Sequence, residues 1–306
     1  MIINDANLAS LRTNLRREFQ AGLDMGNGQV FHGEVAMRVP SSTKSNTYGW
    51  LSKFPKMREW VGDRVLKDLA EDSYVIANKL YEATVEVERT DIEDDILGIY
   101  GPIAQAAGHE TAIKPSRDLA TLMAAGTATL CYDGQNFFDT DHPVYANEDG
   151  TGAASTVSNY DDNGGVGGTA WYLLDCSRPV RPFIHQERML PEFDTLDDPR
   201  TNDQVFMRDV FLYGVRYRMN VGFGLWQCAY RSERPLNADN FEAAYTALQS
   251  IKRDGGEPMG IMPTHLVVPP ALRSAALKIA QAEFINGGDS NVNAKAVKPL
   301  VVPWLA

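Results

Sequence analysis

One stretch, Tyr48–Tyr100, constrains the fold most because it concentrates aromatic residues and strand formers among charged residues. Its second half alternates, with Val85 and Val87 between polar neighbours, which predicts a strand with one wet face over residues 73–90. The first limb, Tyr48–Val65, mixes aromatics with Lys and Arg, and the charged link KDLAED joins the two limbs. This pattern predicts a long β-ribbon. Because an isolated ribbon is marginally stable in water, we expect it to pack on another subunit.

The composition sets the class of protein. A chain of 306 residues is long enough for one large domain or two entwined ones. Its net charge of -11 argues against a general nucleic-acid binder, because phosphate neutralisation needs clustered Lys and Arg. Cys131, Cys176 and Cys228 form neither a disulfide framework nor a CxxC pair, which favours reduced, cytoplasmic thiols. We expect no secretion signal and no membrane span.

Helical periodicity marks two regions in the first half of the chain. Apolar residues recur at helical spacing over the first twenty residues, and Gly22 is expected to end this helix. A second helical region follows the acidic segment DIEDD and extends to about Gly126, with Pro102 and Pro115 expected to break it into pieces. The apolar positions that define these two helices are Leu8, Leu11, Leu15 and Phe19 in the first and Leu119, Leu122 and Met123 in the second.

The second half of the chain returns to strands and then alternates helix and strand. Apolar residues occupy both faces of the segment 210–217, which predicts a strand buried on both sides. Asn237 or Asp239 is expected to cap a helix that Gly255-Gly256 closes. THLVV then predicts a short buried strand stopped by Pro269, followed by a further helix and a closing strand in VKPLVVPWLA. The Gly-, Ser- and Asn-rich segment 147–168 is typical of a surface loop.

The best candidates for chemistry are three carboxylates and an imidazole in CYDGQNFFDTDHP, namely Asp133, Asp139, Asp141 and His142. Such groups can bind a divalent metal or act as acid and base. The segment is nevertheless dense in turn formers and lacks specific metal-site spacings such as HExxH, so a structural turn is the favoured interpretation. We therefore expect no catalytic, cofactor-binding or metal-binding residue.

Cys131 could pair with His142 or His185 as a nucleophile and its base, which only geometry would establish. The local signatures of catalytic cysteines are missing, so a buried inert thiol is favoured. No Walker loop, GxSxG motif or strand-linked GxGxxG occurs.

Five long blocks of sequence resemble the major head (capsid) subunits of Mu-like bacteriophages and prophages. The resemblance is specific, because the blocks are idiosyncratic and spread over almost the whole chain. They are SSTKSNTYGWLSKFPKMREWVGDR, SYVIANKLYEATVEVERTDIEDDILGIY, CYDGQNFFDTDHPVY, WYLLDCSRPVRPFIHQER and THLVVPP.

This resemblance implies an α+β protein with the Hong Kong 97 phage major capsid fold. Such a subunit has an N-terminal arm, an extended E-loop, a peripheral domain with a spine helix, and an axial domain near the capsomer centre. In many tailed-phage capsids, a unit similar to the helix–strand–helix segment precedes a stretch similar to WYLLD. In this sequence the unit follows that stretch. Either the axial domain has a different chain order, or one of the blocks is mapped wrongly. The implied spans are 1–40 for the arm, 41–92 for the E-loop, 93–130 for the spine helix, 131–170 for a loop-rich segment of either domain, 171–234 for peripheral-domain strands, and 235–306 for the helix–strand–helix unit of the axial domain.

The function implied is that of a structural subunit, not an enzyme. Copies of the chain would self-assemble into pentamers and hexamers of an icosahedral shell around phage double-stranded DNA, assembled in the bacterial cytoplasm and retained in the virion. Implied partners are the chain itself, a scaffolding protein, a maturation protease and a portal, with no cofactor, no membrane and no sequence-specific DNA contact. The E-loop residues expected to contact a neighbouring subunit are Tyr48, Trp50, Phe54, Arg58, Trp60, Arg64, Tyr74 and Tyr81.

Two other functions remain open at this point. One is an encapsulin-like compartment, which has the same fold and encloses a cargo enzyme. The other is a cytosolic hydrolase that uses Asp139, Asp141 and His142.

Overall fold

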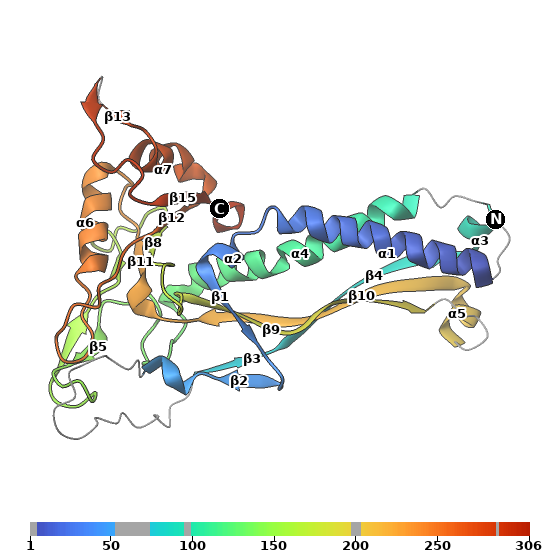
Figure 1. Ribbon diagram of the computed structural model, residues 1–306, viewed down its shortest axis with the longest axis horizontal. Helices are drawn as coiled ribbons and strands as arrows, with labels where there is room; N and C mark the ends of the chain where they lie inside the picture. The colour runs from blue at the N-terminus through green and yellow to red at the C-terminus, as the bar shows by residue number, and fades with distance from the viewer. Residues whose placement is uncertain (1–4, 53–73, 95–98, 197–202, 286–287) are drawn as a thin grey trace.

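The computed structural model describes residues 5–52, 74–94, 99–196, 203–285 and 288–306. Figure 1 shows two parts: a long body that contains the N-terminal helix, and a second unit at one end of this body. The helices described here lack an apolar stretch of the length that a bilayer crossing requires.

Two long helices and a four-stranded sheet form the body (Figure 1). Helix α1 (Asp5–Asn27) and helix α4 (Tyr100–Ala124) lie side by side and run in the same direction. The sheet order is β1-β9-β10-β4, with β1 parallel to β9 and the other neighbours antiparallel. The strands are β1 (Ala36–Pro40), β9 (Phe183–Leu196), β10 (Val210–Phe223) and β4 (Lys79–Glu88).

The contact between α1 and α4 depends on glycine. A Cβ on Gly22 would lie 1.9 Å from the carbonyl oxygen of Gln105, and a Cβ on Gly108 would lie 2.1 Å from that of Phe19. The prediction that Gly22 ends the first helix is wrong, because α1 continues to Asn27. The missing side chain lets two backbones approach and does not terminate the helix. The predicted apolar stripe is confirmed, since Leu8, Leu11, Leu15 and Phe19 are all buried.

Helix α4 is continuous, so the prediction that two prolines break this region is wrong. Pro102 lies in the first turn, where backbone N–H groups have no intrahelical acceptor. Pro115 lies inside the helix and forfeits a hydrogen bond, but it is buried in the contact with the rest of the body. Leu119 and Met123 are fully buried, as the predicted apolar face requires. The acidic segment before α4 forms a separate short helix, α3 (Arg89–Glu93).

Strand β4 has the predicted solvent-exposed face. Val85 and Val87 are buried, while Glu86 and Glu88 are exposed. The strand pairs along its whole length with β10, and most of the limb 48–65 expected to pair with it lies outside the described residues. Among the described residues of the loop region, ribbon pairing is found between two three-residue strands, β2 (Ser45–Thr47) and β3 (Val75–Ala77).

Strand β10 is buried on one face because the helices cover only one side of the sheet. The predicted burial of its other face is wrong, since Val210 and Leu212 are half-buried. The face toward the helices is buried at Phe211, Tyr213, Val215 and Tyr217.

The second unit is a five-stranded sheet of order β15-β12-β8-β11-β7 with helices α6 and α7. Strands β8 and β11 come from the segment 171–234, yet β9 and β10 from the same segment belong to the body. The chain therefore passes from the second unit into the body and back. The elements are β7 (Tyr160–Asp161), β8 (Trp171–Leu174), β11 (Ala229–Ser232), β12 (His265–Val268), β15 (Lys298–Val301), α6 (Ala238–Gln249) and α7 (Arg273–Ala280).

The predicted start of the helix in this unit is confirmed, but the prediction that Gly255-Gly256 closes it is wrong, because α6 ends at Gln249 and these glycines form a later turn with positive φ. The side-chain oxygen of Asn237 accepts a hydrogen bond from the backbone N–H of Asn240 at 2.8 Å and so caps α6. Strand β12 ends directly before Pro269. The remaining short elements are α2 (His32–Val35), α5 (Asp203–Arg208), and the pairs β5 (His142–Tyr145) with β6 (Ala154–Val157) and β13 (Phe284–Ile285) with β14 (Asp289–Ser290).

Candidate assembly site and the buried polar clusters

The loop that carries the predicted assembly residues leaves and rejoins the body at adjacent points. Strands β2 and β3 pair antiparallel, and the backbone N–H of Tyr48 donates to the carbonyl of Tyr74 at 2.7 Å. We call residues 45–52 and 74–78 the loop base. The intervening residues 53–73 lie outside the described part of the chain.

Gln186 on β9 fixes the loop base to the body. Its side chain is fully buried, and its Oε1 accepts from the Tyr48 hydroxyl at 2.8 Å. Its Nε2 donates to the carbonyl of Ile76 at 3.0 Å and to Oδ1 of Asn78 at 2.8 Å. One amide therefore bonds both limbs of the loop base.

Strand β10 adds a second set of contacts. The Tyr74 hydroxyl accepts from the backbone N–H of Phe223 at 2.9 Å, and Asn220 Nδ2 donates to the carbonyl of Ala77 at 2.7 Å. Ile76 packs directly over Gly222, where a Cβ would approach its Cδ1 to 2.2 Å. The loop base is thus part of the folded body and not a freely hinged segment.

Four of the eight predicted assembly residues fall within the described chain. Tyr48 is only 2% exposed, Trp50 and Tyr74 are half-buried, and the hydroxyl of Tyr81 donates to Asp118 Oδ2 on α4 at 2.8 Å. Burial raises the pKa of Tyr48 and Tyr74 to about 12, so both phenols keep their protons. As contacts with another subunit, all eight residues stay predictions. The other four, Phe54, Arg58, Trp60 and Arg64, lie outside the described residues.

Replacing Gln186 with Ala should weaken the loop base. The change leaves the Tyr48 hydroxyl and the Ile76 carbonyl without these partners, at a cost of about 1–3 kcal/mol in the free energy of unfolding. Urea denaturation measures this loss, and limited proteolysis should cleave the loop faster. Gln20→Ala on the exposed face of α1 is the control and should change neither. Equal protease resistance of Gln186→Ala and the unmodified chain would contradict the role assigned to this amide.

A second buried polar cluster joins α2, α4 and the sheet. Ser116 Oγ accepts from the backbone N–H of Phe31 at 3.1 Å and lies 2.9 Å from His32 Nδ1. The His32 and His185 rings meet edge to face with centroids 4.9 Å apart. Burial lowers the pKa of both imidazoles to about 4. The nearby His185 lowers the pKa of His32 further, and the positive charge of Arg38 lowers the pKa of His185 further.

Stability should therefore depend on pH below neutrality. The unfolded chain binds protons at these two imidazoles with a pKa near 6.5, whereas the folded chain binds them only near 4. The unfolded state holds more protons between these values, so the free energy of unfolding falls as the pH drops from 6.5 to 4. His185→Gln should reduce this loss by on the order of 3 kcal/mol, measured by urea denaturation across the pH window. His109→Gln serves as control, and an unchanged pH profile in His185→Gln would contradict the assignment.

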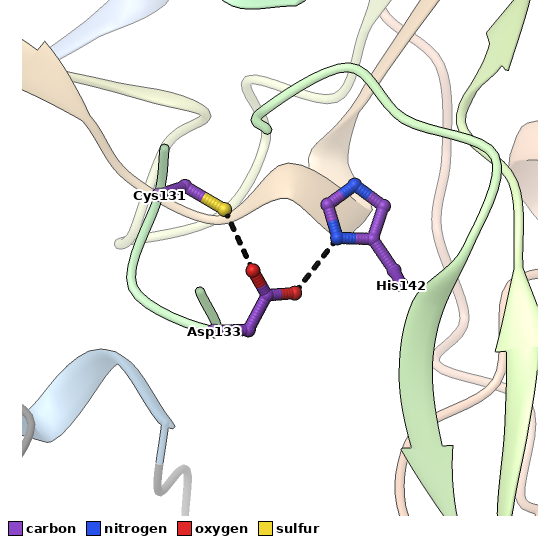
Figure 2. A group of neighbouring side chains, drawn as sticks. All are labelled: Cys131, Asp133 and His142. Atoms are coloured by element: carbon purple, nitrogen blue, oxygen red, sulfur yellow. Dashed lines mark hydrogen bonds and ion pairs between the residues drawn. The ribbon is translucent and has the colours of Figure 1, made fainter. Parts of the chain in front are cut away.

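The segment CYDGQNFFDTDHP, which holds the candidate catalytic residues, contains one buried cluster of Cys131, Asp133 and His142 (Figure 2). Cys131 Sγ donates to Asp133 Oδ1 at 3.0 Å, and Asp133 Oδ2 lies 2.7 Å from His142 Nδ1. Burial opposes ionisation of Asp133, but hydrogen bonds from His142 and Cys131 outweigh it and lower the pKa of this carboxyl. Burial also raises the pKa of the Cys131 thiol far above its usual range. This thiol is therefore a poor nucleophile, in agreement with the inert interpretation.

The other two acids of the predicted set lie outside this cluster. Asp139 accepts hydrogen bonds from the backbone N–H groups of Thr140 at 2.8 Å and Asn136 at 3.3 Å, as a turn residue does. Asp141 is exposed. Desolvation and a side-chain hydrogen bond with Asp139 raise the pKa of Asp141, so these two acids interact with each other. All three cysteines are buried and free, as predicted.

Sequence reasoning missed Gln186, Asn78 and Asn220. Gln186 reaches residues 108 to 138 positions away in the chain. No local pattern marks a polar residue within a strand as the partner of such distant groups. Only the pairing of β9 with β10 places it under the loop base.

Solved structures of phage shells have the same fold. A chain of the bacteriophage JBD30 procapsid is 49% identical, with a TM-score of 0.86 over 99% of this chain and 100% of that chain. A chain of the JBD30 capsid is 39% identical, with a TM-score of 0.72 over 90% of both chains. The long helices along a sheet, the loop base and the second unit together define a phage major capsid subunit, with the predicted α+β Hong Kong 97 fold.

Related sequences give the family. The major capsid protein of Escherichia phage Mu is 44% identical over 96% of this chain and 95% of its own length. The Mu-like prophage FluMu major head subunit of Haemophilus influenzae is 44% identical over 88% of this chain and 86% of its own length. The chain belongs to the Mu-like prophage major head subunit family, gpT, whose model matches residues 8–305. It is a structural subunit of a phage head, and these relatives do not favour the hydrolase or the encapsulin-like compartment.

Proposed function

We propose that this chain forms pentamers and hexamers that close as an icosahedral shell around double-stranded DNA, with the loop carried by the loop base lying across an adjacent subunit. The observation that carries the proposal is the firm attachment of the loop base to β9 and β10 through Gln186, Tyr74 and Ile76. Because the loop base is attached rigidly to the sheet, a loop that contacts an adjacent subunit would fix the orientation of that subunit relative to this one. Repeated by symmetry, modest contacts of this kind produce a strong shell.

The face of the body sheet opposite the helices, beyond the part that the loop base covers, supplies a second contact surface. Residues of even number on β4 and β9 point away from α1 and α4, because side chains alternate along a strand. Leu80 is 58% exposed and Leu190 is 60% exposed at one end of this face. In the middle, Arg216 pairs in register with Glu82 on one side and Glu192 on the other. Exposed leucines beside a row of charged side chains suit a subunit interface in which the charged pairs determine how the two subunits are oriented.

The two units of the fold correspond, in this proposal, to the domains of a capsid subunit. The body contains the N-terminal arm, the spine helix α4 and the peripheral sheet, and the five-stranded sheet with α6 and α7 is the axial domain. The axial sheet then draws β8 and β11 from the segment 171–234 as well as β12 and β15 from 235–306. This accounts for the chain order that the sequence blocks show. A scaffolding protein, a maturation protease and a portal are the further partners.

Expression of the full chain tests the proposal. Size-exclusion chromatography and negative-stain microscopy should show rings, sheets, tubes or shells, formed by the chain alone or with its scaffolding protein. A monomer that persists at all concentrations, even with the scaffolding protein present, would overturn the assembly function.

A further inference from the structure

The Cys131–Asp133–His142 cluster combines a thiol, a carboxylate and an imidazole at one point (Figure 2). One ligand atom from each of the three side chains lies within 4.8 Å of the other two. Burial protects the group, since His142 is 0% exposed and the Asp133 side chain 11% exposed. We propose that this cluster is a binding site for a thiophilic divalent transition metal of the Zn²⁺ class. The proposal stands apart from the assembly function.

The ligand set matches this class of metal. Zn²⁺ takes thiolate, imidazole and carboxylate ligands, with three protein ligands and a fourth position left for water or another oxygen. Thiolate favours Zn²⁺ over the hard cations Ca²⁺ and Mg²⁺, which take oxygen ligands. Binding would release one proton, from Cys131 Sγ, and the proton that bridges His142 Nδ1 to Asp133 would move to Nε2, because a neutral imidazole coordinates through its unprotonated nitrogen.

The distances allow a metal after a small adjustment. Metal–ligand bonds of about 2.0–2.3 Å in a tetrahedral site place neighbouring ligand atoms roughly 3.3–3.6 Å apart. The present separations are 3.0 Å from Sγ to Oδ1 and 2.7 Å from Nδ1 to Oδ2. These two pairs must therefore open by about half an ångström, while the ligand atoms of Cys131 and His142, which lie within 4.8 Å of each other, must come to a similar separation.

The surroundings hold two of the three ligands in position. The His142 ring stacks on Trp226 with centroids 3.9 Å apart and an interplanar angle of 8°. The backbone N–H of Gln135 donates to Asp133 Oδ1 at 3.1 Å, and the N–H of Cys131 donates to the Gln135 carbonyl at 2.8 Å. Partners of this kind orient ligands and raise metal affinity. A bound metal would tie the 131–135 turn to β5, which begins at His142.

Titration of the purified full chain with Co²⁺, after removal of metals by a chelator, tests the site. The expected result is a thiolate-to-cobalt charge-transfer band at one equivalent, abolished by excess Zn²⁺. Zn²⁺ should also raise the melting temperature. Cys131→Ser should lose both effects, whereas Cys176→Ser, which changes another buried free thiol, should keep them.

The opposite results are equally specific. Absence of the cobalt band in the unmodified chain, or a band that survives in Cys131→Ser, would overturn the proposal and leave a hydrogen-bonded turn. Should Cys131→Ser fail to fold, His142→Gln replaces it, with loss of the band in a folded protein as the supporting outcome and retention as the contrary one.

Discussion

Replacement of residues 53–73 by a short Gly-Ser linker between Ser52 and Tyr74 should abolish closed shells and leave a folded subunit. The loop base explains why the subunit survives. Tyr48 and Tyr74 are already joined by a 2.7 Å backbone hydrogen bond, so a short linker closes the gap without pulling on β4. Ile76 and Gln186 remain in place and keep their buried contacts. The lost residues include four of the predicted assembly contacts, Phe54, Arg58, Trp60 and Arg64.

Two measurements separate folding from assembly in this experiment. Thermal unfolding followed by circular dichroism should give a melting temperature close to that of the unmodified chain. Negative-stain microscopy should show capsomers or open fragments in place of shells. A second variant with residues 53–73 in scrambled order keeps the length and composition, and we expect it to fail in the same way. Closed shells of normal size from the linker variant would remove the loop from the assembly mechanism.

Short-range patterns in the sequence predicted local structure well. The stripe of Leu8, Leu11 and Leu15 and the alternation around Val85 each report which face of one element is buried. This information is local, because a helix or strand repeats its orientation every few residues. Asn237 identified the start of α6 for the same reason, since its partner is only three residues away.

Long-range contacts explain what the sequence could not predict. Strand β4 needed an antiparallel neighbour, and the alternation around Val85 is equally compatible with the limb 48–65 and with β10. Gly22 looked like a helix terminator because nothing nearby in the sequence reveals Gln105 against it. The same holds for the cluster, where Cys131 and His142 meet only because the 131–135 turn folds back toward β5. The family resemblance supplied the fold that these local signals left open.

Gly108→Ala should destabilise the body strongly although it adds only one methyl group. Alanine ordinarily stabilises a helix interior by about 1 kcal/mol relative to glycine. At Gly108 the new Cβ would lie 2.1 Å from the Phe19 carbonyl oxygen and 2.9 Å from the Leu23 nitrogen, so α1 must move away from α4. Backbone atoms cannot rotate aside as side chains do. We expect a net loss of about 3 kcal/mol in the free energy of unfolding, a large share of the 5–15 kcal/mol of a typical domain.

Gly101→Ala, one residue into the same helix, is the matched control. Its Cβ would meet only the Cγ of Glu18 at 3.7 Å, an ordinary contact, so this variant should be as stable as the unmodified chain. Urea denaturation of both variants measures the difference, and the yield of shells should follow it. Equal stability of the two variants would mean that α1 can shift along the body at little cost. A large difference would instead establish that α1 and α4 behave as one rigid element, the property required of a spine to which a loop that reaches a neighbouring subunit is attached.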